Sequence, residues 1–174
     1  MNKTLDRCDL LITGGQVIDG TGCPAITADV AVQGDRIIAV GDLTVEKADA
    51  VIDAQGKVIT PGFIDVHTHD DRLLLSNSEV TPKLSQGVTT VVVGNCGVSL
   101  SPWLSDRAPP PPLDLVFSDG KNGAHFSTFH SYSTELARRP AAINALSLIG
   151  HSTLRCGVMD RLDRPATQAE IEQM

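Results

Sequence analysis

The first sixty residues alternate short hydrophobic stretches with turn residues. Gly34 and Gly56 lie in two of the short connections, and each connection predicts a β-hairpin because glycine tolerates a positive φ. Residues 1–60 are therefore interpreted as part of a small β-domain. The strands predicted within it span residues 9–18, 28–32, 36–40, 50–53 and 57–60.

From residue 58 onward the pattern changes to buried strands separated by helices. Residues 58–66 are apolar on both faces apart from Asp65, as expected for a parallel strand that is covered on both sides. The other predicted elements are a helix at 78–86, a strand at 87–93, a helix at 128–139 and a strand at 143–149.

Three further segments of this second part give more specific expectations. Phe129, Tyr132 and Leu136 share one stripe of their helix, which favours a position in the core over a cofactor contact. Residues 99–123 predict a loop, whose consecutive prolines favour extended backbone and are compatible with either an ordered excursion or a partner-binding motif. Thr167 and Glu170 have the spacing of a capping box and begin a last helix, of which barely one turn follows.

Composition and charge narrow the functional classes. The chain has 174 residues, of which 41% are hydrophobic, and a formal net charge of -7. This acidity, without a basic cluster, argues against a nucleic-acid surface. Residues 1–20 do not resemble a signal peptide, and no window is apolar enough for a membrane span. The four cysteines lie far apart, which fits reduced thiols. We therefore expect a cytoplasmic protein that binds neither nucleic acid nor membrane.

Two histidines, His67 and His69, end the first strand of the second part. Side chains alternate along a strand, so both histidines share a face, with Cα atoms roughly 6.6 Å apart. A His-x-His pair alone is more often an exposed strand end than a metal site. Cys96, however, ends the next strand, and two parallel strands joined by a helix end at the same edge of a sheet. The three side chains are therefore candidate ligands of one metal ion.

Residues 61–71 and 94–97 resemble the N-acyl-D-amino-acid deacylases, or D-aminoacylases, of the amidohydrolase superfamily, and residues 150–155 extend the resemblance. It implies an α/β fold, a metal-dependent (β/α)8 barrel with a small β-domain, of which residues 61–174 supply about three strands. It also implies that Cys96 binds zinc and that His67 and His69 belong to the same centre of one or two ions. The implied reaction is zinc-dependent hydrolysis of the amide bond of a small-molecule N-acyl-D-amino acid, giving a carboxylate and a D-amino acid.

Four other residues near these motifs are candidates for supporting roles. Asp65 shares the face of the histidines and is expected to orient one of them through its second ring nitrogen. Asp70 and Asp71 follow His69 and are expected at the rim of the site. His151 falls at the carboxyl end of the third predicted strand, so it belongs either to the wall of the active site or to a hydrogen bond with nearby backbone.

The resemblance leaves two alternatives. One is another amidohydrolase, of the hydantoinase or dihydroorotase type, in which a carbamylated lysine on a later strand bridges the metals; Cys96 argues against it. The other is a truncated, non-catalytic chain. Because only about three of eight barrel strands are accounted for, we expect an N-terminal part of a longer protein, with the general-base aspartate beyond residue 174. The isolated 174 residues are expected neither to hydrolyse such amides nor to hold zinc tightly.

Overall fold

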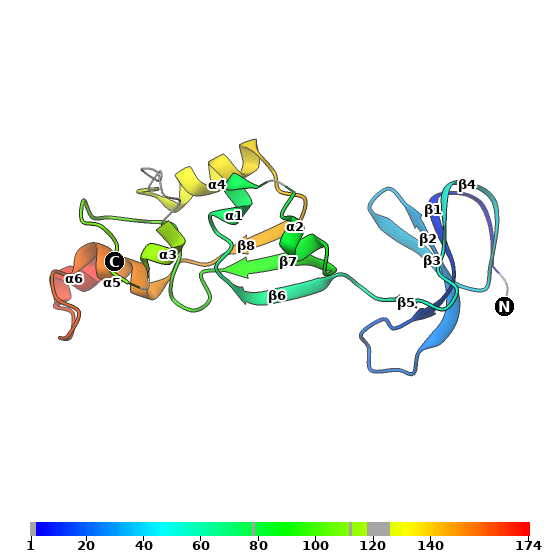
Figure 1. Cartoon of the computed structure of the whole chain (residues 1–174), viewed down its shortest axis with the longest axis horizontal. Helices are drawn as coiled ribbons and strands as arrows, with labels where there is room; N and C mark the ends of the chain where they lie inside the picture. The colour runs from blue at the N-terminus through cyan, green and yellow to red at the C-terminus, as the bar shows by residue number, and fades with distance from the viewer. Residues whose placement is uncertain (1–2, 78, 112, 118–125) are drawn as a thin grey trace. The chain divides into compact units, whose positions relative to one another are not determined.

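The computed structural model describes residues 3–77, 79–111, 113–117 and 126–174 (Figure 1). The chain forms two compact units, Met1–Pro61 and Gly62–Met174. Each unit has its own sheet and its own hydrophobic core. None of the helices in the described residues is long and apolar enough to cross a membrane.

The first unit is a mixed β-sheet built around its longest strand, β1. β1 pairs with β2 in antiparallel fashion and with β4 and β5 in parallel fashion. Cys8 of β1, Ala31 of β2 and Ala39 of β3 are buried together and form the centre of its core. The strands are β1 (Lys3–Val17), β2 (Ile26–Gln33), β3 (Arg36–Gly41), β4 (Leu43–Asp53) and β5 (Val58–Ile59).

The first predicted hairpin of this unit is confirmed. β2 and β3 are antiparallel, and Gln33 pairs with Arg36 across a two-residue connection. Gly34 in that connection has a φ of +58°, a conformation that residues with a Cβ rarely adopt. Its N–H donates to Asp9 Oδ2 at 2.6 Å, which ties the turn to β1.

The second predicted hairpin is wrong. β4 and β5 do not pair with each other, because both run parallel to β1, where Asp53 faces Thr13 and Val58 faces Gln16. Between them the chain makes a tight turn, in which the N–H of Lys57 donates to the carbonyl of Ala54 at 2.9 Å, and then resumes its direction. A glycine-containing turn can reverse the chain direction, as in a hairpin, or can join two segments that run in the same direction. Here both segments pair with β1, so the chain direction is kept.

The second unit is a three-stranded parallel sheet with helices between its strands (Figure 1). Val91 and Val93 of the central strand, β7, are fully buried against Leu74 of α1, and α1 contacts α4. The strands are β6 (Phe63–Thr68), β7 (Val88–Val93) and β8 (Asn144–Ser147). The helices are α1 (Leu73–Ser76), α2 (Thr81–Leu84), α3 (Asp114–Phe117), α4 (Phe129–Arg138), α5 (His151–Val158) and α6 (Gln168–Gln173).

Of the three predicted helices, one is shortened near a proline and two are confirmed, whereas α1, α3 and α5 were not predicted. The single helix expected at 78–86 is reduced to α2, which has Pro82 in its first turn and follows Val80, whose φ is +46°; residue 78 lies outside the described residues. The helix expected at 128–139 is confirmed as α4, and the side chain of Thr128 caps it. The capping box of Thr167 and Glu170 is also confirmed, at the start of α6.

The strand expected at 58–66 is divided between the two units. Val58–Ile59 forms β5 beside β1, whereas Phe63–Thr68 forms β6 beside β7. The expected burial of β6 is wrong, since Phe63, Ile64 and Val66 are 57%, 62% and 58% exposed. The physical reason is that β6 is an edge strand in the described sheet and pairs only with β7.

The first part of the loop predicted at 99–123 contributes to the larger core of this unit. Leu100 and Trp103 are buried, and the rings of Trp103 and Phe117 pack with centroids 5.0 Å apart. Tyr132 belongs to the same cluster, so the core interpretation of the α4 stripe is confirmed. Residue 112 and residues 118–123 of the predicted loop lie outside the described residues.

Candidate metal centre

The parallel pairing of β6 and β7 positions the candidate ligands. Asp65 faces Val91 and Thr68 faces Val93, so the two strands end at the same edge of the sheet. His67 lies one residue before the end of β6, and His69 follows that end directly. Cys96 lies in the turn that follows β7.

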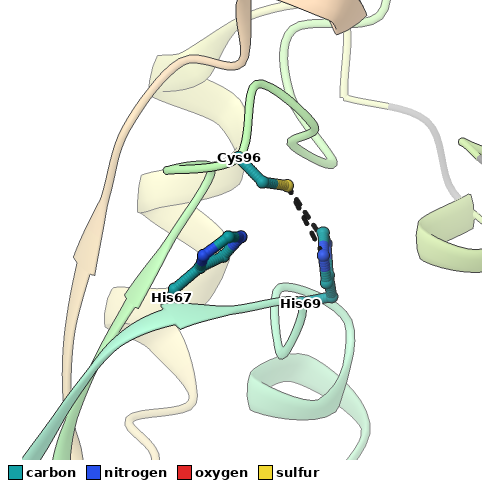
Figure 2. A group of neighbouring side chains, drawn as sticks. All are labelled: His67, His69 and Cys96. Atoms are coloured by element: carbon teal, nitrogen blue, oxygen red, sulfur yellow. Dashed lines mark hydrogen bonds between the residues drawn. The ribbon is translucent and has the colours of Figure 1, made fainter.

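The three predicted ligands are brought together by the structure. One ligand atom from each of His67, His69 and Cys96 lies within 4.8 Å of the others. The sulfur of Cys96 is 3.4 Å from Nε2 and 3.7 Å from Nδ1 of His69, and the two imidazole centroids are 6.1 Å apart. Figure 2 shows the three side chains pointing toward one another from the two strand ends. All three are exposed to solvent.

The donor atoms fit a zinc ion, and so does the separation of Cys96 and His69. Zinc bonds of about 2.3 Å to sulfur and about 2.0 Å to nitrogen place tetrahedral ligand atoms roughly 3.3 to 3.6 Å apart. The 3.4 Å between the Cys96 sulfur and His69 Nε2 lies in that range. Two imidazoles and a thiol are also donors that zinc and similar borderline ions prefer over oxygen.

The turn that carries Cys96 has a local structural cause in its glycines. Gly94 and Gly97 have φ of +82° and +89°, and the N–H of Gly97 donates to the carbonyl of Gly94 at 3.0 Å. A Cβ on Gly94 would lie 2.1 Å from the carbonyl oxygen of Leu148, so only glycine fits against the end of β8. Asn95, which sequence reasoning did not single out, donates from Nδ2 to the carbonyl of Val66 at 2.8 Å.

The start of α5 supports this turn from the other side. The carbonyl of Gly97 accepts the N–H groups of Ser152 and Thr153 at 2.8 and 3.2 Å. The hydroxyl of Ser99 accepts the N–H of Gly150 at 2.9 Å, and Thr153 Oγ1 accepts the N–H of Ser99 at 2.9 Å. The segments 94–97 and 150–155 are therefore parts of one hydrogen-bonded support for Cys96.

His151 occupies the first position of α5, where Gly150 is the N-terminal cap. It is exposed and lies outside the group formed by the three candidate ligands. Its role at the wall of the site stays a prediction.

Asp65 has partners other than the histidine ring that the sequence suggested. Its Oδ1 accepts the backbone N–H of His67 at 3.2 Å, and its Oδ2 accepts a proton from Lys83 Nζ at 2.7 Å. The hydrogen bond from Lys83 and that from His67 hold the pKa of Asp65 below its ordinary value. Asp65 thus fixes the backbone of a candidate ligand instead of its ring.

Lys83 on α2 was missed by sequence reasoning, because no motif marks it. Its ammonium also lies 3.1 Å from Asp70 Oδ2 and 3.1 Å from Thr68 Oγ1. Partial burial lowers the pKa of Lys83, but the hydrogen bonds to Asp65 and Asp70 outweigh that effect and raise it above the ordinary value. Lys83 therefore stays a cation near neutral pH.

Asp71 is not at the rim but buried, with 1% of its surface exposed. Its Oδ1 accepts the N–H of Leu100 at 3.0 Å, and its carbonyl accepts the hydroxyl proton of Tyr132 at 2.9 Å. Burial raises the pKa of the Asp71 carboxyl. Asp71 thereby joins the segment after His69 to the segment after Cys96.

Comparison with known proteins places the chain in a family. Residues 50–174 match the model of a family described as the amidohydrolase family. The chain belongs to the amidohydrolase family. It is 52% identical over 166 residues to a D-aminoacylase of Alcaligenes xylosoxydans xylosoxydans and 51% identical over 176 residues to an N-acyl-D-aspartate deacylase of the same organism. These matches cover 95% and 99% of this chain but 34% and 35% of the relatives, so the chain spans about one third of their length.

Solved structures agree with this assignment. A D-aminoacylase crystal structure superposes with a TM-score of 0.88 at 52% identity, over 95% of this chain and 34% of that one. An N-acyl-D-glutamate deacylase from Bordetella bronchiseptica, complexed with zinc and a phosphonate inhibitor, superposes with a TM-score of 0.87 at 39% identity. That match covers 97% of this chain and 35% of the deacylase. The resemblance to N-acyl-D-amino-acid deacylases and the α/β fold expected from the sequence are thus confirmed.

Proposed function

We propose that the protein is a zinc-dependent deacylase that hydrolyses the amide bond of N-acyl-D-amino acids to a carboxylate and a D-amino acid. The observation that carries the proposal is the convergence of His67, His69 and Cys96, with ligand atoms within 4.8 Å, at the ends of two parallel strands. The 52% identity to a D-aminoacylase supports the substrate class. Because the chain spans about one third of such relatives, the activity is proposed for the protein that the native gene encodes.

In this proposal His67, His69 and the thiolate of Cys96 hold zinc. When bound, the ion would act as a Lewis acid toward the acyl carbonyl and would make hydroxide available from water near neutral pH. The chain's own contribution is to hold the ligand set in place. Asp65 fixes the backbone of His67, and Asn95 fixes the Cys96 turn against β6 through the carbonyl of Val66.

Asp70, Asp71 and His151 have supporting roles in the same proposal. Asp71 holds the two segments that follow the ligands, because it accepts the N–H of Leu100 while its carbonyl accepts from Tyr132. Asp70 lies beside the ligands and pairs with Lys83 at 3.1 Å. His151 begins α5, directly before the two N–H groups that support the Cys96 turn, and we assign it to the wall of the substrate site.

The direct test is an assay of the whole protein that the native gene encodes, on N-acyl-D-amino acids and their L enantiomers. Metal content is measured in parallel, before and after chelation and after zinc is restored. We expect turnover of the D series that disappears with the metal and returns with zinc. His67→Ala is expected to abolish both turnover and metal binding. The matched control is His130→Ala, at an exposed histidine of α4, which is expected to keep both.

Cyclic amides belong in the same assay. A hydantoinase or dihydroorotase type of amidohydrolase would open a hydantoin or dihydroorotate ring and leave linear N-acyl-D-amino acids intact. Such a result, or full metal content in Cys96→Ser, would reject the deacylase proposal.

A further inference from the structure

Lys83 has every proton of its ammonium group engaged by residues that surround the candidate ligands. The distances from Nζ are 2.7 Å to Asp65 Oδ2, 3.1 Å to Asp70 Oδ2 and 3.1 Å to Thr68 Oγ1. A lysine ammonium has three donors and no acceptor, so this set of partners saturates it. The side chain is only 22% exposed, which limits competition from water.

The three partners enclose the two histidines in the sequence. Asp65 precedes His67, and its second oxygen accepts the backbone N–H of His67 at 3.2 Å. Thr68 lies between the histidines, and its hydroxyl donates to Asp70 Oδ2 at 2.7 Å, just beyond His69. One cation therefore fixes the backbone on both sides of both candidate ligands.

The cation itself is held from a different element. α2 is a single turn that begins after Val80, whose side chain is fully buried in the cluster with Leu74, Val91 and Val93. The φ of Val80, +46°, directs the chain into the turn that carries Lys83. Lys83 thus links the end of β6, where the histidines are, to the packed core beneath the sheet.

Charge and geometry predict opposite effects for this lysine, which makes its role testable. A positive charge close to a metal ion repels it, so electrostatics alone predicts tighter zinc binding when Lys83 is removed. The hydrogen bonds predict the reverse, because the strand end that presents His67 and His69 loses its common anchor. Residues that orient metal ligands typically contribute about 10- to 100-fold to metal affinity.

We propose that Lys83 is a positioning residue of the metal centre, which acts through Asp65, Thr68 and Asp70 to hold His67 and His69 in register with Cys96. This role rests on the proposed zinc centre. It concerns the affinity and the geometry of that centre, both of which can be measured without substrate.

The experiment uses the whole protein that the native gene encodes, stripped of metal and titrated with Co²⁺ and Zn²⁺ alone. Cobalt reports the geometry through its visible absorption and the Cys96 thiolate through a near-ultraviolet charge-transfer band. For Lys83→Met we expect a 10- to 100-fold rise in the Zn²⁺ dissociation constant and an altered cobalt spectrum. Lys83→Arg, which keeps the charge and the donors, is expected to restore most of the affinity.

Lys47→Met, at an exposed lysine of the first unit, is the control for removal of one positive charge and is expected to leave both readouts unchanged. If Lys83→Met does not fold as the metal-free protein, Lys83→Gln replaces it, with a smaller loss expected in the same direction. Unchanged or tighter zinc binding with an unaltered spectrum in either variant overturns the positioning role. Absence of the thiolate band in the unmodified protein would overturn the zinc centre itself.

Discussion

The sulfur of Cys96 lies 3.4 Å from Nε2 of His69, although the two residues are 27 positions apart in the chain. The contact exists because β6 and β7 are parallel neighbours and end at the same edge of the sheet. A thiol and an imidazole at this distance can share a metal ion without a large rearrangement of the backbone.

Cys96→Ser should therefore disrupt metal binding more than the loss of any supporting residue. Supporting residues contribute about 10- to 100-fold to metal affinity, so we expect the loss of a ligand to exceed about 100-fold. The measurement is a competition titration with Zn²⁺ and a chromophoric chelator. Cys23→Ser, at an exposed free cysteine of the first unit, is the control and should bind as the unmodified protein does.

The zinc content of His67→Ala and His151→Ala should distinguish a metal ligand from a residue that lines the substrate site. His67 belongs to the group of convergent ligand atoms, whereas His151 begins α5 outside that group. We expect His67→Ala to lose most of the bound zinc and His151→Ala to keep it, with any defect of the latter confined to substrate turnover. The measurement is zinc content by elemental analysis. An equal loss of zinc in both variants would show that His151 is also a ligand.

The metal-ligand cluster could be predicted because it depends on chain order and strand direction. His67 and His69 end one strand, Cys96 ends the next, and a connection through α1 and α2 makes the strands parallel. Such topology is encoded in local pattern, since helix and strand periodicities are visible in the sequence.

The supporting contacts could not be predicted, because they depend on loop paths that tertiary packing decides. Lys83 and Asn95 show no periodicity or spacing that relates them to the histidines. Asp71 was expected at the rim, but its carboxylate turns inward to the N–H of Leu100. The hydrophobic pattern of β6 likewise indicates a covered strand, whereas the described sheet pairs β6 with β7 alone.

Gly94→Ala should destabilise the second unit and weaken metal binding together. A residue with a Cβ costs about 1–2 kcal/mol at a left-handed φ. At Gly94 the Cβ would also meet the carbonyl oxygen of Leu148 at 2.1 Å, and relief of that overlap costs about 1–3 kcal/mol more and displaces Cys96. Urea unfolding followed by the fluorescence of Trp103, the single tryptophan, measures the stability.

Gly87→Ala is the matched control for that experiment. Gly87 has a φ of +80°, against +82° for Gly94, but its added Cβ would meet only the ring of Phe63, at 3.4 Å. We expect Gly87→Ala to lose only the conformational term of about 1–2 kcal/mol and to keep its metal affinity. Equal losses in the two variants would mean that the approach of Gly94 to Leu148 is unimportant.

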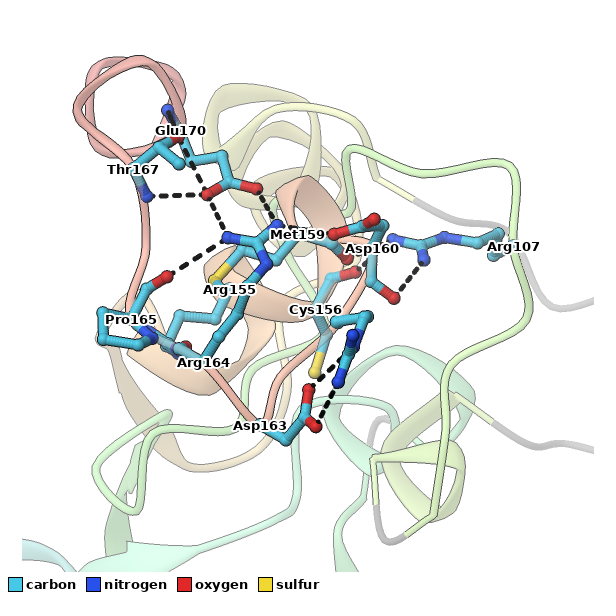
Figure 3. Close-up of polar contacts among 11 residues, drawn as sticks. Arg107, Arg155, Cys156, Met159, Asp160, Asp163, Arg164, Pro165, Thr167 and Glu170 are labelled. Carbon is cyan, nitrogen blue, oxygen red and sulfur yellow. Dashed lines mark hydrogen bonds and ion pairs between the residues drawn. The ribbon is translucent and has the colours of Figure 1, made fainter.

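The last prediction concerns α6, which an arginine holds through a two-pronged ion pair (Figure 3). Arg164 donates to the two carboxylate oxygens of Glu170 at 2.6 and 2.8 Å, and the N–H of Thr167 donates to the same carboxylate at 2.7 Å. The hydrogen bonds from Arg164 are the largest cause, followed by that from Thr167, of a Glu170 pKa lowered to about 2 from 4.5.

A carboxyl group whose pKa is lower in the folded state than in the unfolded state stabilises the fold at a pH above its unfolded-state pKa. This stabilisation is lost as the pH falls to the folded-state pKa. Glu170→Gln keeps a side chain that fits a capping box but removes the charge. We therefore expect this variant to melt below the unmodified protein at pH 7, with a difference that shrinks from about pH 4.5 toward pH 2. Glu172→Gln in the same helix, where Glu172 accepts from Gln168, controls for charge removal. A difference that stays constant down to pH 2.5 would show that the ion pair with Arg164 does not stabilise α6.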